Sequence, residues 1–144
     1  MKASLVSGLR LALFAALGIG CQSALCTEDI GCEPNLTFDF DGEHLPAGDY
    51  EIIVESSSGE ASCETTIHDD GSADSDCSGD FEIDPSLRDV VVYDTPEEAS
   101  LVITSDGDTV TTAEAEPEYT DYYPNGEDCG GVSCQVAYVT AELP

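Results

Sequence analysis

The chain has 144 residues and a formal net charge of −28, because 31 Asp and Glu residues outnumber 3 Lys and Arg residues. A surface of this sign makes nucleic acid and anionic membrane surfaces poor partners, and its self-repulsion opposes the compact state. The acidity has two open interpretations, salt adaptation or the binding of a basic partner or a cation. In either case we expect salt, divalent cations or disulfides to support the fold.

The first twenty residues predict export. Lys2 and Arg10 precede the apolar run 11–17, which ends in small residues. A positively charged start, an apolar run too short to span a bilayer and a small-residue exit are typical of a secretory signal peptide over residues 1–20. Once that segment is removed, Arg88 is the one Lys or Arg residue that the chain retains.

The next residue is Cys21, and "LGIGC" resembles the lipobox of bacterial lipoproteins. In that family a signal peptidase cuts before the cysteine, which receives a diacylglyceryl group. Gly18 stands where the family usually has Leu, so ordinary cleavage and plain secretion are the alternative. The resemblance implies that residues 21–34 form a lipidated tether. Gln22, in place of the Asp that favours inner-membrane retention, implies the outer membrane.

The 7 Cys residues are an odd number for an exported protein. Assigning Cys21 to a lipid leaves an even set, for which an oxidising compartment favours disulfides over a metal site or a nucleophile. The flanks of Cys63 and Cys77 favour a bond across a loop of about 15 residues, which contributes roughly 3 kcal/mol through loop-closure entropy. The others either pair locally at each end or cross-link the two ends: Cys26, Cys32, Cys129 and Cys134.

Apolar residues recur at every second position along most of the remaining chain, which predicts strands. The alternation is clear in "NLTFDF", "DYEIIV" and "ASCETTI", and "DVVVY" is apolar enough for a buried strand. Within "LVITSDGDTVTTA", the pair Asp106-Gly107 suits a two-residue type I′ turn, which predicts a hairpin.

The last predicted strand is "SCQVAYVTAEL", in which Cys134, Val136 and Tyr138 share one face. No stretch has a helical period longer than about two turns, although residues 95–100 are expected to form one short helical turn. About seven short strands separated by turn signals predict a single antiparallel β-sandwich over residues 35–144, of immunoglobulin-like or prealbumin-like type.

One turn stands out because "LPAGDYEIIV" resembles the "LPxGxYxVxV" corner of many extracellular prealbumin-like and immunoglobulin-like domains. Pro46 fixes its own φ, Gly48 permits the bend, and Tyr50 begins the inward face of the strand. We therefore interpret the stretch as a structural bend rather than a ligand-binding loop.

The sharpest candidate for a site is the acidic run "DSDCSGDFEID", residues 74–84. Its oxygens match several positions of an EF-hand-like calcium loop, in which alternate side chains converge on one ion and Gly79 makes the bend. Pro85 stands where such a loop has a bidentate Glu, so a solvated acidic hairpin loop is the alternative. The candidate Ca²⁺ ligands are Asp74, Asp76, Ser78, Asp80 and Glu82.

A second group of acids, Asp39, Asp41 and Glu43, precedes His44. Glycoside hydrolysis needs two carboxylates about 5 to 10 Å apart in a cleft with shifted pKa values, and the sequence marks no such cleft. It also contains no G-x-S-x-G elbow. We therefore expect no enzymatic activity and no cofactor apart from the Ca²⁺ considered above.

Tyr119, Tyr122 and Tyr123 precede the last strand, where they either cover that strand or form a binding patch. With "CTEDIGC" and the "LPAGxY" corner, the "Y-x4-PNG-x2-C-x4-C" ending resembles small uncharacterised lipoproteins of myxobacteria and related Gram-negative bacteria. The resemblance implies an envelope lipoprotein with a sandwich fold, and it brings no known activity.

The sequence thus predicts a bacterial envelope lipoprotein that acts as a non-enzymatic structural or interaction module. Its expected partners are the membrane, through a lipid on Cys21, and an envelope or basic protein, but not nucleic acid. The alternative is a divalent-cation-binding protein that holds Ca²⁺ in the acidic loop 74–82.

Overall fold

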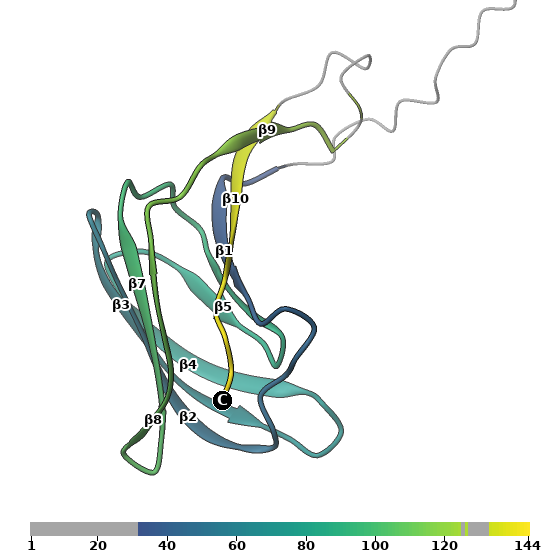
Figure 1. Ribbon diagram of the computed structural model, residues 1–144, viewed down its shortest axis with the longest axis vertical. Coiled ribbons are helices and arrows are strands. Elements are labelled where there is room, and N and C mark those ends of the chain that lie inside the picture. The colour runs from purple at the N-terminus through teal and green to yellow at the C-terminus, as the bar shows by residue number, and fades with distance from the viewer. Residues whose placement is uncertain (1–31, 125, 127–132) are drawn as a thin grey trace, which may run out of the picture.

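The computed structural model describes residues 32–124, 126 and 133–144. The predicted signal peptide, Cys21, Cys26 and Cys129 lie outside the described residues. Within them the regular elements are β-strands, and no helix there is long and apolar enough to cross a membrane. The strands form two five-stranded sheets that pack face to face (Figure 1). The predicted all-β sandwich is therefore confirmed.

The first sheet, called sheet A, holds both ends of the described domain. Its central strands β1 and β10 lie side by side and run parallel, whereas its other neighbouring strands run antiparallel. A parallel pair needs a long crossover, and here the rest of the domain supplies it. The strand order is β5 (Ile83–Pro85), β6 (Asp89–Val92), β1 (Asn35–Asp39), β10 (Cys134–Thr140) and β9 (Thr120–Tyr122).

The second sheet, called sheet B, is antiparallel throughout. The hairpin between its last two strands turns at Asp106 and Gly107, whose φ angles are 53° and 84°. Both are positive, as a type I′ turn requires, so the predicted hairpin is confirmed. The strand order is β4 (Ala73–Gly79), β3 (Gly59–Ile67), β2 (Gly48–Ser56), β7 (Ala99–Ser105) and β8 (Asp108–Ala115).

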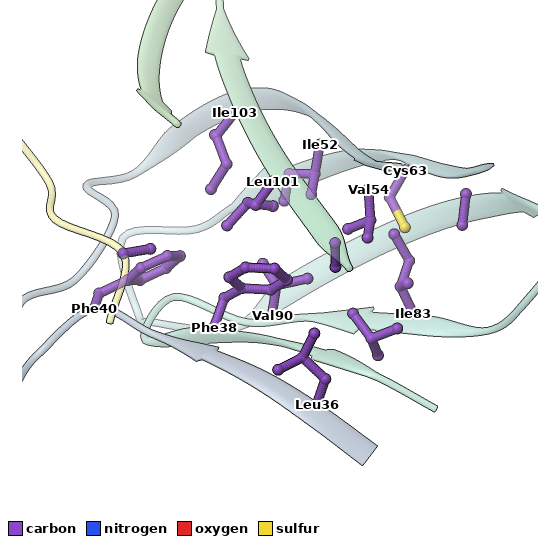
Figure 2. Packing of buried hydrophobic residues seen from close by; sticks show 14 of the residues in the cluster. Leu36, Phe38, Phe40, Ile52, Val54, Cys63, Ile83, Val90, Leu101 and Ile103 are labelled. Carbon is purple, nitrogen blue, oxygen red and sulfur yellow. The ribbon is translucent and has the colours of Figure 1, made fainter. Parts of the chain in front are cut away.

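The inward-facing residues of both sheets meet in one apolar core. Figure 2 shows Leu36 and Phe38 of β1 below Val54 of β2 and Leu101 of β7. All four side chains are fully buried. Burying each such side chain contributes about 1.5–3 kcal/mol, which explains why the alternating apolar pattern determines which side of each strand faces inward.

The Pro-Gly bend before β2 has the structural role predicted for it. The Tyr50 ring is buried, and its hydroxyl donates a hydrogen bond to the Pro46 carbonyl oxygen at 2.8 Å. Burial also raises the pKa of Tyr50, because the ionised phenolate is poorly solvated there. The bend is thus held by the first inward residue of the strand it introduces.

The short helical turn predicted at residues 95–100 is wrong. That segment is irregular until β7 begins at Ala99, which pairs with Ser56 of β2. Its backbone bonds to a neighbouring turn, because the Glu97 amide donates to Ser57 Oγ and the Ser57 amide donates to the Glu98 carbonyl. These tertiary bonds replace the local ones that a helical turn needs.

Two disulfides lie within the described residues. Cys63 and Cys77, the pairing favoured from the sequence, face each other directly across β3 and β4, with their Cα atoms 4.1 Å apart. Cys32 and Cys134 are 102 residues apart in the chain, and their bond joins the segment before β1 to the start of β10. For this pair the structure therefore selects the cross-link between the two ends.

Candidate functional site

The outer surface of sheet B carries most of its charge on three adjacent strands. Because side chains alternate along a strand, every second residue of β2, β3 and β4 points away from the core. We call this surface the acidic face. Its exposed carboxylates are Asp49, Glu51, Glu55, Glu60, Glu64, Asp74 and Asp76.

Like charges oppose each other directly at the centre of the acidic face. Glu51 of β2 lies opposite Glu64 of β3, which in turn lies opposite Asp76 of β4. We call these three residues the carboxylate row. Directly opposed residues have Cβ atoms about 4.5–5.5 Å apart, so ionised side chains there repel each other. Two neighbouring depressions in the surface include all three residues in their lining.

Next to the carboxylate row, Asp49 and Asp74 of the acidic face each have a hydrogen-bond partner. Thr66 Oγ1 donates to Asp49 Oδ1 at 2.7 Å, and His68 Nε2 lies 2.8 Å from Asp74 Oδ2. The hydrogen bond to the Asp74 carboxylate is the main reason that the pKa of His68 is raised. This pair is the one salt bridge within residues 32–124, 126 and 133–144.

The loop predicted at residues 74–82 is mostly a strand, so the sequence prediction of its conformation was wrong. Asp74, Asp76 and Ser78 lie along one side of β4, with about 6.6 Å between successive side chains rather than around a common centre. Asp80 lies beyond the strand and accepts a hydrogen bond from the Glu60 amide at 3.2 Å. In the described part of the chain, no group of three or more His, Cys, Asp or Glu residues is placed to hold a metal ion.

Pairing with β3 explains why this acidic run is extended. Its backbone bonds to β3 from Ala73 to Gly79, and Cys77 is covalently tied to Cys63 in the middle of that ladder. Asp, Ser and Gly have low intrinsic strand propensity, so the local sequence gives no signal for β4. Charged side chains do suit an edge strand, where they oppose pairing with another chain.

The acids that precede His44 form a tight turn. Asp39 Oδ1 accepts a hydrogen bond from the Asp41 amide at 2.6 Å, and the Glu43 amide donates to the Phe40 carbonyl. Asp41 has a φ of 52°, in the left-handed region that Asp tolerates in turns. The Asp39 carboxylate is thus occupied in closing the end of β1.

The outer surface of sheet A differs from the acidic face. Tyr138 of β10 is 72% exposed and Tyr122 of β9 is 53% exposed, and they are the exposed large hydrophobic residues within the described ranges. We define the tyrosine face as these two residues together with the outward residues that surround them on β1, β6 and β10. Those surrounding residues are Thr37, Val91 and Val136.

Two of the tyrosines before the last strand differ in their exposure to solvent. Tyr119 packs against the core, and its hydroxyl donates to the Pro96 carbonyl at 3.0 Å. Burial, aided by the charge of Asp94, raises the pKa of Tyr119 to about 12. Tyr122 lies in β9 opposite Cys134 and is exposed, so it contributes to a surface.

Sequence reasoning missed part of both faces. Alternation alone points Glu51 and Glu64 outward, but only the strand register places them beside Asp76. The sequence correctly predicted that Cys134, Val136 and Tyr138 share one side of the last strand. The structure shows that this side points away from the core. The inward residues of β10 that pack on the core are Ala137 and Val139.

Comparisons with known proteins give no match to this chain: no family model, no curated protein and no solved structure is similar to it.

Proposed function

We propose that this protein is a bacterial envelope lipoprotein, exported, cut before Cys21 and held at the outer membrane by a lipid on that cysteine. The proposal is supported by the signal-peptide pattern of residues 1–20 and by the lipobox-like "LGIGC". It is also supported by the Cys32–Cys134 disulfide, which fastens the base of the proposed tether to β10 of sheet A. A pull on the tether therefore acts on a strand of the sandwich rather than on a loose end.

The lipoprotein acts by binding, and its binding surface is the acidic face. The observation that supports this assignment is the carboxylate row, in which Glu64 has an acid directly opposite on both sides. Such opposition costs stability, and a cationic partner relieves it. The partner is a basic segment of an envelope protein that lies along the depressions between these strands.

The test measures binding of a fluorescent oligolysine peptide to the full-length protein. We expect Glu51→Gln, Glu64→Gln and Asp76→Asn together to weaken binding more than a control of equal charge change, Glu116→Gln, Glu118→Gln and Glu142→Gln. The control residues are exposed and lie outside the acidic face. Equal weakening by both triple variants would show that only net charge matters, and the acidic face would then have no specific role.

The effect of divalent cations on the melting temperature distinguishes this function from the alternative, Ca²⁺ binding by residues 74–82. Ca²⁺ and Mg²⁺ at equal ionic strength are expected to raise the melting temperature equally if the acidic face only attracts cations. An increase specific to Ca²⁺, and lost in an Asp74→Asn, Asp76→Asn variant, would favour the cation-binding protein instead.

A further inference from the structure

The tyrosine face is uncharged at its centre, unlike the acidic face. Its central positions on β1 and β10 are uncharged, with Thr37 beside Tyr138 in the strand register. The outward acids of sheet A lie toward the β5–β6 edge or at the end of β1: Asp39, Asp84 and Asp89. Near the same edge, burial raises the pKa of Tyr93, and the charges of Glu33 and Glu82 help to raise it further. An approaching anionic or zwitterionic surface therefore meets less repulsion at the centre of the tyrosine face than on the acidic face.

The proposed tether joins the domain on this same face. Cys134 and Val136 are buried but lie outside the core cluster, because their side chains point to the outer side of β10. Cys32 is bonded to Cys134, and its Sγ atom lies 3.8 Å from the Tyr122 carbonyl oxygen. The chain that leads back to Cys21 thus departs next to Tyr122.

The tether limits how far this end of the domain lies from the membrane. Residues 21–31 separate the proposed lipid from Cys32, and a fully extended chain of that length spans at most about 40 Å. Figure 1 shows β9 and the start of β10 extending beyond the rest of the sandwich, and Cys32 is bonded to Cys134 at the start of β10. The exposed tyrosine at this end is Tyr122, which lies in β9.

We propose that the tyrosine face lies against the headgroup region of a phospholipid bilayer and orients the tethered domain, so that the acidic face points away from the membrane. This inference rests on the proposed lipid anchor. Tyr side chains favour the membrane interface, where the ring meets apolar chains and the hydroxyl meets water. The lipid holds the protein at the membrane, and the two exposed rings together with the charge asymmetry select which side faces it.

Single tryptophans test the orientation, because the natural chain contains no Trp. The reporter is Tyr138→Trp on the tyrosine face, and the matched control is Thr112→Trp, an exposed outward position on β8 of sheet B. Each full-length variant is extracted from membranes with its lipid and reconstituted into phosphatidylcholine vesicles with or without brominated acyl chains. Bromine quenches tryptophan emission only at close range.

We expect brominated vesicles to quench and blue-shift the emission of Tyr138→Trp and to leave Thr112→Trp unchanged. Tyr122→Trp is a second reporter in case the first variant does not fold, and it should be quenched as well. Equal quenching of reporter and control, or quenching of neither, would overturn the proposed orientation.

Flotation of the same vesicles on a density gradient distinguishes the two proposals. Protein that floats while its tyrosine-face reporters stay unquenched retains the anchor and contradicts the orientation alone. Protein that fails to float contradicts the lipid anchor, and the orientation fails with it. Floating protein with quenching confined to the tyrosine face supports both.

Discussion

The outer faces of the two sheets are built from the same alternating pattern and yet differ at their centres. On sheet B, outward positions of neighbouring strands bring carboxylates together, with Glu64 between Glu51 and Asp76. On sheet A, the outward positions at the centre of β1 and β10 are uncharged and include Tyr138 and Thr37, which is only 6% exposed, whereas Asp39 and Asp89 oppose each other at one end. The comparison shows that strand order and register, and not the alternating pattern alone, determine which side chains meet on each face.

The largest effects are expected from removing the two disulfides, one belonging to each sheet. Loop-closure entropy gives about 4.7 kcal/mol for a loop of about 100 residues and about 3 kcal/mol for one of about 15. We therefore expect Cys32→Ala with Cys134→Ala to lower the free energy of unfolding more than Cys63→Ala with Cys77→Ala. Denaturant unfolding of both variants measures the difference, and the reverse order would contradict the role given to the bond between the chain ends.

An added carboxylate should have very different effects on the two faces. In Thr37→Asp the new charge is buried next to Tyr138 and Val91 without a cation, so we expect a loss of about 3–5 kcal/mol. Thr112→Asp places the same charge at an exposed position on sheet B, where the change is expected to stay within about 0.5 kcal/mol.

Thermal melts of these two variants and of Thr37→Val provide the check. The Thr37 hydroxyl donates a hydrogen bond to Asn35 Oδ1. Thr37→Val removes this bond without adding a charge, so it measures the effect of the lost hydroxyl alone. Similar losses for the two Asp variants would show that the outer side of sheet A is as well solvated as the acidic face.

Neutralising the centre of the carboxylate row should stabilise the protein. Glu64→Gln removes two direct oppositions, each costing about 0.2–1 kcal/mol, and the gain should shrink as salt screens the charges. Glu114→Gln is the control, because Glu114 lies opposite Ser100 rather than another acid. Melting temperatures at low and high salt measure both, and an equal gain in the two variants would argue against local repulsion in the row.

The smallest expected effect is a pH dependence from the acidic face. The pKa of His68 is raised, mainly by its hydrogen bond to Asp74, so the folded protein holds that proton more tightly than the unfolded chain does. The resulting stability is present below the unfolded pKa of about 6.5 and is lost as the pH rises through the folded value. The melting temperature should therefore fall more steeply over this range in the natural protein than in His68→Gln. Parallel curves would contradict a folded-state interaction of His68.

Local patterns predicted those parts of the fold in which local and tertiary preferences agree. The buried apolar residues of β2 and β7 recur at every second position, and the Asp106-Gly107 turn needs only its own two residues. β4 was missed because its Asp, Ser and Gly residues do not favour a strand, and its pairing with β3 is a tertiary effect. β5 and β9 have 3 residues each, too few for a period to be visible.

The composition of the acidic face and of the tyrosine face depends on the order of the strands, which cannot be inferred from a local sequence pattern. Tyr138 becomes a neighbour of Thr37 because the first and last strands pair, and Glu51 meets Glu64 through the register of one hairpin. The Cys32–Cys134 bond follows from the same pairing of the chain ends. Sequence spacing alone left that bond as one of two possibilities.

The most direct test of the central claim, a lipid-anchored and disulfide-stapled domain, is the intact mass of the membrane-extracted protein before and after reduction. We predict a mass that corresponds to cleavage before Cys21 plus a lipid adduct, with a gain of two hydrogens for each disulfide on reduction. An unlipidated protein with a free thiol would contradict the anchor, and Cys21 would then need another role.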